Sequence, residues 1–199
     1  MDNQQGLTDF EIGWICGLFD GEGYVGMNIT DNYSAMKKLK TRRHTILVPR
    51  LVMSNTDYAA TMLYSNLLKK AGVGVHIQAG RRGNPKHKPC YKATINGHKR
   101  VFKAMSILNR CQIKRPSLDV LYKWLLHRKE QYQYSLKDYE FYLEFMKASG
   151  KTPNDSTLRR LYDSCTAELY KPRDYLIMAW ESRRKVESNL REKSAVVMG

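Results

Sequence analysis

Residues 14–23 read Trp-Ile-Cys-Gly-Leu-Phe-Asp-Gly-Glu-Gly, an apolar helix that runs into a turn of alternating glycines and carboxylates. The C-terminus of a helix carries partial negative charge and unpaired carbonyl groups. Asp20 and Glu22 therefore have the wrong charge for this position, and a cation should lie beside them. A bound divalent metal ion is the simplest candidate.

The composition fits one globular domain with an anionic partner. The chain has 199 residues, of which 42% are apolar, and its 34 Lys and Arg outnumber 19 Asp and Glu to give a net charge of +15. Such an excess favours a polyanion, and nucleic acid is a better candidate than a membrane surface because no single basic amphipathic helix gathers the charge. No apolar run is long enough to span a membrane and the N-terminus lacks a signal pattern. We therefore expect an intracellular protein that is not secreted and does not bind membranes.

The helix that contains this stretch has a well-marked start. Thr8 and Glu11 have the spacing of a capping box, and we expect the helix to run from there to about Asp20. Gly13 and Gly17 place small residues on one face. Because glycine inside a helix costs about 1 kcal/mol relative to alanine, their presence favours close approach of a second helix.

Alternating and apolar segments follow this helix in a regular order. Strands are predicted at Tyr24–Thr30, His44–Ser54, Val73–Ala79 and Cys90–Ile95, and helices at residues 55–71 and Gly97–Leu108. Pro49 indicates an edge or a bulge in the second strand. The core order is therefore α-β-β-α-β-β-α, an α+β fold with an antiparallel sheet.

Beyond Ile113 the apolar residues recur at helical spacing. Helices are predicted at Ser117–Gln131, Ser135–Ser149, Asp155–Tyr170 and Arg173–Glu192. We expect residues 1–116 to form the core and residues 117–199 a helical extension packed on it.

Residues 15–23 resemble the signature of the LAGLIDADG homing endonucleases. Gly17, Leu18, Asp20 and Gly23 match that signature letter for letter, and Glu22 conservatively replaces its second aspartate. The resemblance covers about residues 7–116, since this family uses the same order of helices and strands. It implies a DNA endonuclease that depends on a divalent metal, Mg²⁺ or a substitute such as Mn²⁺.

The resemblance also implies roles for individual residues of the motif. Glu22 would bind the metal at the scissile phosphate, and the carbonyl of Gly21 could be a second contact. Two metals about 4 Å apart could then stabilise the attacking and the leaving oxygen of a phosphodiester displacement. The face that packs against the same helix of a second unit would contain Gly13, Cys16, Gly17 and Asp20, although Asp20 fits a structural role at the helix end better than a metal ligand.

Two further positions follow the layout of the family. Asn55, at the end of the second strand, could orient water or metal, or could simply cap the next helix. Lys114, after the last core helix, could stabilise the phosphate transition state or polarise the water. A solvated lysine or an ordinary phosphate contact is the alternative for Lys114.

Polar residues of the sheet and its loops are the candidates for DNA contacts. One face of an antiparallel sheet is buried and the other is polar, and a curved β-ribbon fits the major groove. The candidates on the strands are Asn28, Thr30, Asn32, Arg50, His76, Gln78, Lys92 and Thr94. Those in the loops are Lys37, Lys38, Lys40, Arg42, Arg43, Arg81, Arg82, Lys86 and Lys88. Most of these cations would contact only phosphates, or nothing.

The chain contains one copy of the motif. A two-fold active site therefore needs two chains, and we predict a homodimer that recognises a long, roughly palindromic duplex. The chain begins with Met and lacks the terminal residues of protein splicing, so we expect an intron-encoded or free-standing enzyme rather than an intein.

Two other functions remain open for a protein with this motif. An RNA-binding maturase that helps its host intron to splice could use the basic helical extension as an RNA surface. A non-cleaving DNA-binding regulator is the third interpretation, and the retained carboxylate of Glu22 argues against it. A site-specific endonuclease that makes a double-strand break is the function that motif, topology and charge favour together.

Overall fold

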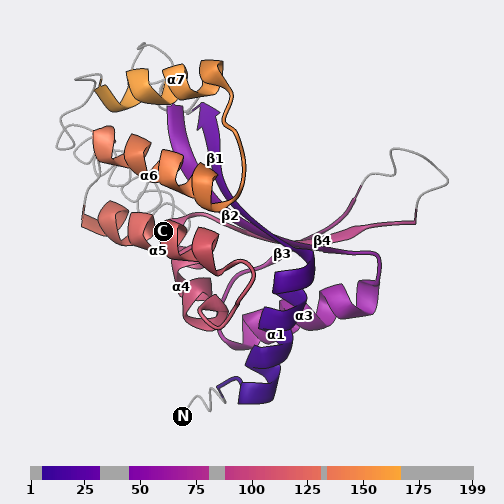
Figure 1. The fold of residues 1–199 in the computed structure, drawn as a ribbon. Coiled ribbons are helices and arrows are strands. Elements are labelled where there is room, and N and C mark those ends of the chain that lie inside the picture. Colours follow the sequence, from indigo (N-terminus) through magenta and orange to yellow (C-terminus); the bar gives the residue numbers. More distant parts are fainter. Residues whose placement is uncertain (1–5, 32–44, 81–87, 131–133, 167–199) are drawn as a thin grey trace, which may run out of the picture.

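The computed structural model describes residues 6–31, 45–80, 88–130 and 134–166 (Figure 1). The core elements are α1 (Asp9–Glu22), β1 (Gly23–Asp31), β2 (Thr45–Asn55), α3 (Tyr58–Lys70), β3 (His76–Ala79), β4 (Tyr91–Asn96) and α4 (His98–Leu108). They are followed by α5 (Arg115–Glu130), α6 (Leu136–Ala148) and α7 (Asp155–Thr166). The predicted α+β class and the α-β-β-α-β-β-α order are confirmed. The predicted helix Arg173–Glu192 lies outside the described residues.

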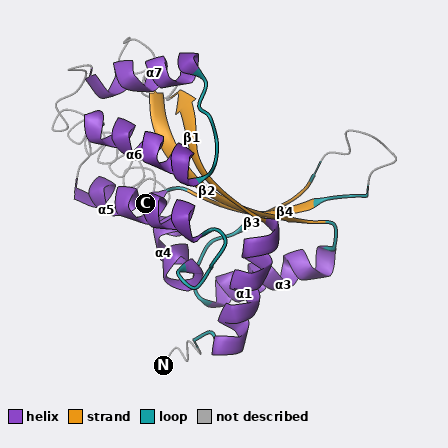
Figure 2. Ribbon diagram, viewed as in Figure 1, coloured by secondary structure: helices purple, strands orange, loops and turns teal. Residues whose placement is uncertain are grey.

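The strands form one four-stranded antiparallel sheet with the order β1-β2-β4-β3 (Figure 2). β3 is shorter than predicted, because it begins at His76 rather than at Val73. β2 is an inner strand, although Pro49 indicated an edge. β4 pairs only with Arg50–Asn55 of β2, so Pro49, which has no N–H to donate, lies just beyond that ladder.

The start of α1 is the capping box that the sequence predicts. The backbone N–H of Glu11 donates to Oγ1 of Thr8 at 3.2 Å, and the N–H of Thr8 donates to Oε2 of Glu11 at 2.7 Å. Ile15 and Phe19 are fully buried and attach the helix to the core. These contacts fix the direction of α1 and therefore the place where its C-terminal end meets the sheet.

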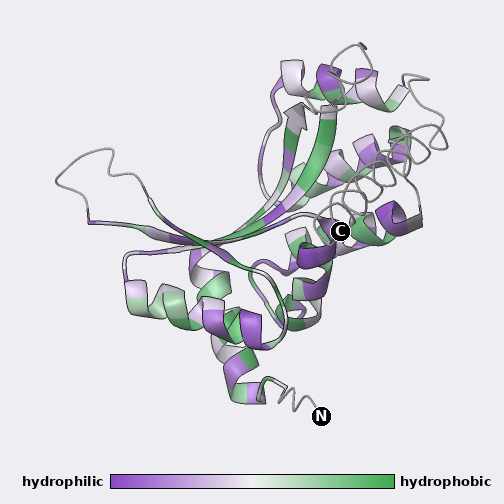
Figure 3. Cartoon of the chain, turned by 180° about the vertical axis from the view of Figure 1, so that it is seen from behind, coloured by the Kyte–Doolittle hydropathy of each residue, from purple (hydrophilic) through white to green (hydrophobic). Residues whose placement is uncertain are grey.

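One face of the sheet is covered by the core and the other is not. Val25, Met27, Leu47, Leu51 and Ile95 belong to a single buried cluster, which also includes residues of the helices from α1 to α7. Seen from behind, the ribbon carries hydrophobic residues on strands and helices alike (Figure 3). The residues that alternate with these along the strands form the opposite face, called the outer face below.

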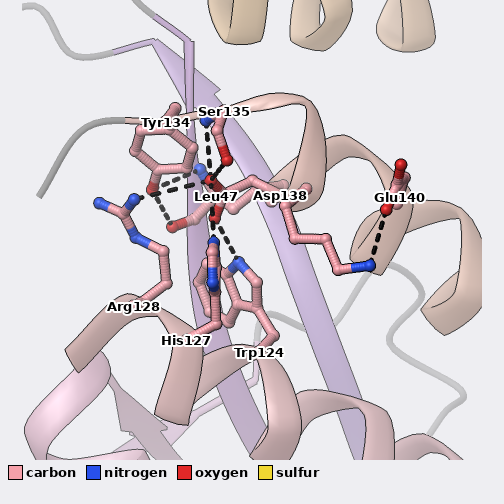
Figure 4. Close-up of polar contacts among 9 residues, drawn as sticks. Leu47, Trp124, His127, Arg128, Tyr134, Ser135, Asp138 and Glu140 are labelled. Carbon is pink, nitrogen blue, oxygen red and sulfur yellow. Dashed lines mark hydrogen bonds and ion pairs between the residues drawn. The ribbon is translucent and has the colours of Figure 1, made fainter. Parts of the chain in front are cut away.

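The connection between α5 and α6, together with α7, covers an edge of β2 that β4 leaves open. The N–H of Leu47 donates to the hydroxyl of Tyr134 at 3.1 Å, and that hydroxyl donates to the carbonyl of Leu47 at 3.0 Å (Figure 4). Burial raises the pKa of Tyr134 to about 12, so the hydroxyl keeps the proton that it donates. The N–H of Thr45 donates to Oγ of Ser164 at 3.1 Å. An open strand edge is thus closed by two side chains of the extension.

A buried carboxylate joins α5 to α6. Asp138 is completely buried and accepts from Nε1 of Trp124 at 2.8 Å and from the N–H of Ser135 at 2.9 Å (Figure 4). Arg128 lies 3.6 Å from the same carboxylate and places its guanidinium 4.2 Å from the ring centre of Tyr134. The network therefore connects α5 and α6 to the residue that closes β2.

We expect Tyr134→Phe to destabilise the protein by about 1–3 kcal/mol, because the buried N–H and carbonyl of Leu47 would lose their partner. Urea unfolding followed by circular dichroism measures this change. Tyr122→Phe is the matched control, since the Tyr122 side chain is 41% exposed. Equal unfolding midpoints for the two variants would show that this hydroxyl does not support β2.

None of the described helices is long and apolar enough to cross a lipid bilayer.

Candidate active site and nucleic-acid interface

The turn after α1 can be made only with glycine at position 23. The N–H of Gly23 donates to the carbonyl of Phe19 and closes the last turn of the helix. A Cβ atom at this position would collide with that carbonyl and with the Phe19 ring. The chain therefore passes directly from α1 into β1, and Gly21 and Glu22 lie exposed at the junction.

Asp20 is held by its own chain rather than by a cation. Its two carboxylate oxygens accept from the backbone N–H of Gln112 at 2.7 Å and from that of Lys114 at 2.9 Å. These N–H groups immediately precede α5, where the positive end of a helix dipole favours a carboxylate. The expectation that both acids of the motif need a cation is therefore wrong for Asp20. Its role is to attach the loop before α5 to the end of α1.

Glu22 is the carboxylate of the motif that keeps no such partner. It is exposed, and among the described residues no hydrogen bond or ion pair reaches its side chain. α1 has no basic residue in its last turn that could offset the charge. An exposed carboxylate at the negative end of a helix attracts a cation from solution.

A single chain offers an incomplete metal site. No cluster of three or more His, Cys, Asp or Glu side chains that could hold a metal occurs in the described part of the chain. Mg²⁺, however, keeps several waters and is commonly bound by one or two carboxylates together with substrate phosphates. The carboxylate of Glu22 and the adjacent carbonyl of Gly21 fit that donor set, provided that a second carboxylate and a phosphate come from outside the chain.

The uncovered side of α1 is rich in glycine. Gly13, Gly17 and Gly21 are exposed, and an ideal Cβ at any of them would meet no atom within 4 Å. Phe10, one turn before Gly13, is 82% exposed. This face, called the glycine face below, runs along α1 toward Glu22.

Cys16 does not belong to the glycine face, so its predicted place in a dimer interface is corrected. It is only 5% exposed, and its Sγ donates to the carbonyl of Ile107 at 3.3 Å. Cys111 donates in turn to the carbonyl of Cys16 at 3.7 Å. The carboxylate of Asp20 is directed at the loop before α5, but Asp20 is only half-buried, so its place in a dimer interface stays a prediction. Gly13 and Gly17 are exposed, and their place in the interface stays a prediction as well.

The other two predicted catalytic residues lie at the ends of elements. Asn55 ends β2, and its side chain accepts from the N–H of Asp57 at 2.8 Å. Asp57, and not Asn55, is the N-cap of α3, which removes one of the two roles considered for Asn55. Lys114 is half-buried, and its backbone is fixed by Asp20, two residues before Glu22.

The strand register places the predicted DNA-contact residues on the outer face. Cross-strand neighbours point to the same side of a sheet, and side chains alternate along each strand. Arg50 pairs with Gly26 and Asn96, Thr94 pairs with Val52 and His76, and Lys92 pairs with Ser54 and Gln78. The residues brought together are Asn28, Thr30, Arg50, His76, Gln78, Lys92 and Thr94.

Within this set, the prediction that Thr94 contacts DNA is corrected. It is only 3% exposed, so it lies on the outer face but cannot offer its hydroxyl to a ligand. Its Oγ1 and the Nε of Arg50 are buried and have no hydrogen-bond partner among the described residues. His76, Gln78 and Lys92 are exposed.

The outer face also includes residues that the sequence analysis missed. Tyr24, 42% exposed, and the exposed Asn96 occupy positions in register with it. Extending the two-residue alternation from Asn28 and Lys92 would have found both. Of the loop candidates, Lys88 is described and exposed. The others, together with Asn32, lie outside the described residues: Lys37, Lys38, Lys40, Arg42, Arg43, Arg81, Arg82 and Lys86.

The fold and these sites define an α+β protein in which the end of a glycine-faced helix meets an antiparallel sheet with a polar outer face. Comparison with solved structures finds this architecture in homing endonucleases. The archaeal intron-encoded homing endonuclease I-Vdi141I, solved in complex with DNA, is 15% identical, with a TM-score of 0.58 over 78% of this chain and 97% of that chain.

Two other solved structures give the same result. The homing endonuclease I-CvuI, solved with its target and Ca, is 12% identical, with a TM-score of 0.54 over 78% of this chain and 94% of that chain. The homing endonuclease I-TnaI is 14% identical, with a TM-score of 0.52 over 81% of this chain and 99% of that chain. No protein-family model and no curated protein sequence matches the chain. The chain therefore has the homing-endonuclease fold, and the resemblance seen in residues 15–23 is confirmed at the level of the fold.

Proposed function

We propose that this protein is an intracellular, site-specific DNA endonuclease that acts as a homodimer and makes a double-strand break in a long, roughly palindromic target. The reaction is metal-dependent hydrolysis of phosphodiester bonds that leaves short 3′ overhangs, and the gene is intron-encoded. The fold supports this proposal, because solved proteins of the same fold include an intron-encoded homing endonuclease complexed with DNA. The net charge of +15 supports a polyanionic substrate.

The observation that carries the proposal is the contrast between the two acids of the motif. Two backbone N–H groups neutralise Asp20, whereas Glu22 is exposed and without a partner in the described residues. A protein that only binds a polyanion would not benefit from a free carboxylate beside its binding surface, since the carboxylate repels phosphates. Glu22, the last residue of α1, therefore has a functional role rather than a structural one.

Two copies of the chain would complete the site. The glycine face allows a second α1 to approach closely, and a two-fold axis that runs along the paired helices would place the two Glu22 carboxylates at the same end. Divalent metal bound there, on Glu22 and the carbonyl of Gly21, would supply Lewis-acid stabilisation and an activated water. Lys114 would lie beside the scissile phosphate and stabilise its developing charge, and Asn55 would orient the water.

The outer face would recognise the DNA. Arg50, Gln78 and Asn28 carry the side chains that make bidentate contacts with bases in the major groove. Lys88 and Lys92, like the cations of the loops, would contact phosphates and fix the register of the protein on the duplex. A dimer would present two such faces related by the same axis, which accounts for a palindromic target.

We expect cleavage to require Mg²⁺. A supercoiled plasmid that carries the joined exons flanking the host intron should become linear with Mg²⁺, and it should remain supercoiled with EDTA, because the carboxylate of Glu22 cannot itself activate water as a metal does. Gel electrophoresis separates the forms. The control reaction contains Ca²⁺ in place of Mg²⁺, so that a divalent cation is present for binding while Mg²⁺ is absent. An equal rate of cleavage in EDTA would rule out the metal-dependent mechanism.

The maturase alternative makes a different prediction for the same protein. A splicing factor would bind the intron RNA and promote splicing whether or not Glu22 can hold a metal. Splicing that survives Glu22→Gln, in a protein that does not cleave the plasmid, would favour this alternative.

A further inference from the structure

Two cysteines from distant parts of the chain lie together in the core. Cys16 is on the buried side of α1, and Cys111 lies in the loop between α4 and α5, where it is fully buried. The Sγ of Cys111 donates to the carbonyl of Cys16 at 3.7 Å, and the Sγ of Cys16 donates to the carbonyl of Ile107 at 3.3 Å. Both residues are free thiols. The fold therefore brings together two thiols that are ninety-five residues apart in the sequence.

The buried thiols differ in how readily they lose a proton. A hydrogen bond from the Cys111 thiol lowers the pKa of Cys16. The same hydrogen bond, together with burial, raises the pKa of Cys111, which keeps the shared proton. Burial raises the pKa of Cys165 to about 12, so that this thiol stays protonated. Because the thiolate is the form that reacts, Cys16 is the member of this set that an oxidant attacks first, and Cys111 is the thiol beside it.

The pair lies at the corner of the fold that positions Lys114. Asp20, one turn after Cys16 in α1, accepts from the N–H of Gln112 at 2.7 Å and from that of Lys114 at 2.9 Å. Cys111 immediately precedes Gln112 in the same loop. A bond between the two sulfur atoms would thus connect the motif helix to the loop that Asp20 already holds.

The neighbours of Cys111 in this loop leave a short route from solvent to the pair. Arg110 and Gln112 are exposed, and the Ile113 side chain is 70% exposed. The Cys111 thiol therefore lies directly beneath surface residues rather than deep in the core. A small oxidant can reach it through a displacement of this loop alone, because local opening needs less free energy than global unfolding.

We propose that Cys16 and Cys111 are a modification site that forms a reversible disulfide with a hydroperoxide as the oxidant. The Cys16 thiolate attacks one oxygen of hydrogen peroxide, the O–O bond breaks, and the hydroxide that leaves takes up the proton released by the thiol. The product is the sulfenic acid of Cys16. The sulfur of Cys111 then attacks the sulfenic sulfur, and the displaced hydroxide leaves as water with the proton of Cys111. Two thiols and one peroxide become one disulfide and two waters.

The disulfide joins α1 covalently to the loop that leads to Lys114. A structural disulfide is not expected in a reducing compartment, where such bonds are transient and respond to oxidants. The site goes beyond the proposed function, because it is built within a single chain and does not depend on DNA cleavage.

Peptide mapping of the unaltered protein tests the proposal. The protein is treated with hydrogen peroxide, its remaining thiols are alkylated, and a non-reduced tryptic digest is analysed by mass spectrometry. We expect the peptide that contains Cys16 to be linked to the peptide that contains Cys111, and dithiothreitol to separate them. Cys16→Ala should abolish the link. Cys90→Ala is the matched control and should leave it intact, since Cys90 is half-buried and lies beside β4.

Thermal unfolding gives a second measurement. Because the disulfide closes a long loop, peroxide treatment should raise the melting temperature of the unaltered protein and of Cys90→Ala by about 5–10 °C. The melting temperature of Cys16→Ala should not rise. Each treated protein is compared with its own untreated form, so that any effect of the substitution on stability cancels.

Three results would overturn the proposal. The first is a link between Cys16 of one chain and Cys16 of a second, which a non-reducing gel shows as a covalent dimer. The second is oxidation of Cys16 to the sulfinic acid while Cys111 is still alkylated. The third is alkylation of both cysteines after peroxide treatment. In each case the proposed function stands, because DNA cleavage is measured separately.

Discussion

Glu22→Gln is expected to lower the rate of Mg²⁺-dependent DNA cleavage by about a thousandfold. Metal stabilisation of the reacting oxygens contributes several kcal/mol, and each 1.36 kcal/mol corresponds to a factor of ten in rate. Glutamine keeps the shape and the helix propensity of the side chain but removes the charge that holds the cation. Single-turnover cleavage of a labelled target duplex measures the rate.

The fold and the DNA affinity should survive this substitution. Glu22 is exposed and has no described partner, so its neutralisation breaks no contact within the chain. Glu144→Gln, on an exposed part of α6, is the matched control and should cleave at the rate of the unaltered protein. Cleavage by Glu22→Gln within threefold of that rate would remove Glu22 from the metal site.

Gly17→Arg is expected to separate the dimer into folded monomers that no longer cleave. An ideal Cβ at Gly17 meets nothing within 4 Å in the single chain, so the substitution leaves the fold of the monomer intact. Between two closely packed helices, the same side chain would force them apart. Overpacking costs about 1–3 kcal/mol for each subunit, and the two subunits together would raise the Kd of the dimer by about thirtyfold or more.

Analytical ultracentrifugation over a range of protein concentrations measures this shift. Asn66→Arg is the matched control, because it introduces the same residue at an exposed position of α3 away from the glycine face. If Gly17→Arg and Asn66→Arg dimerise equally, the subunits do not meet through α1.

The sequence predicted the helices and strands better than it predicted how the strands pair in the sheet. The capping box at Thr8, the α-β-β-α-β-β-α order and the side chains on the outer face follow from local patterns, because spacing alone determines which residues share a face. The shortened β3 and the inner position of β2 do not follow from such patterns. They depend on which strand pairs with which, and that is decided by packing between distant segments.

The residues of the candidate site, too, were predicted only in part. The motif identified Glu22 and Gly17, whereas the partners of Asp20 lie more than ninety residues away, in a loop with no pattern that indicates them. Cys16, predicted for the dimer interface, and Thr94, predicted for DNA contact, are both buried. The sequence could not show this, since small polar residues occupy core and surface positions alike. The contact between Lys151 and the Tyr24 ring, 4.1 Å from Nζ to the ring centre, could not be predicted either, because it depends on how the extension packs against β1.

The central claim is that two copies of Glu22, one from each subunit, hold the metal at the DNA. Crystals of the protein with its target duplex and Mn²⁺, measured at the manganese absorption edge, test this most directly. The account predicts an anomalous-scattering peak in contact with the Glu22 carboxylates of both subunits and with a DNA phosphate. A peak at another place, or Glu22 carboxylates too far apart to share a site, would contradict it.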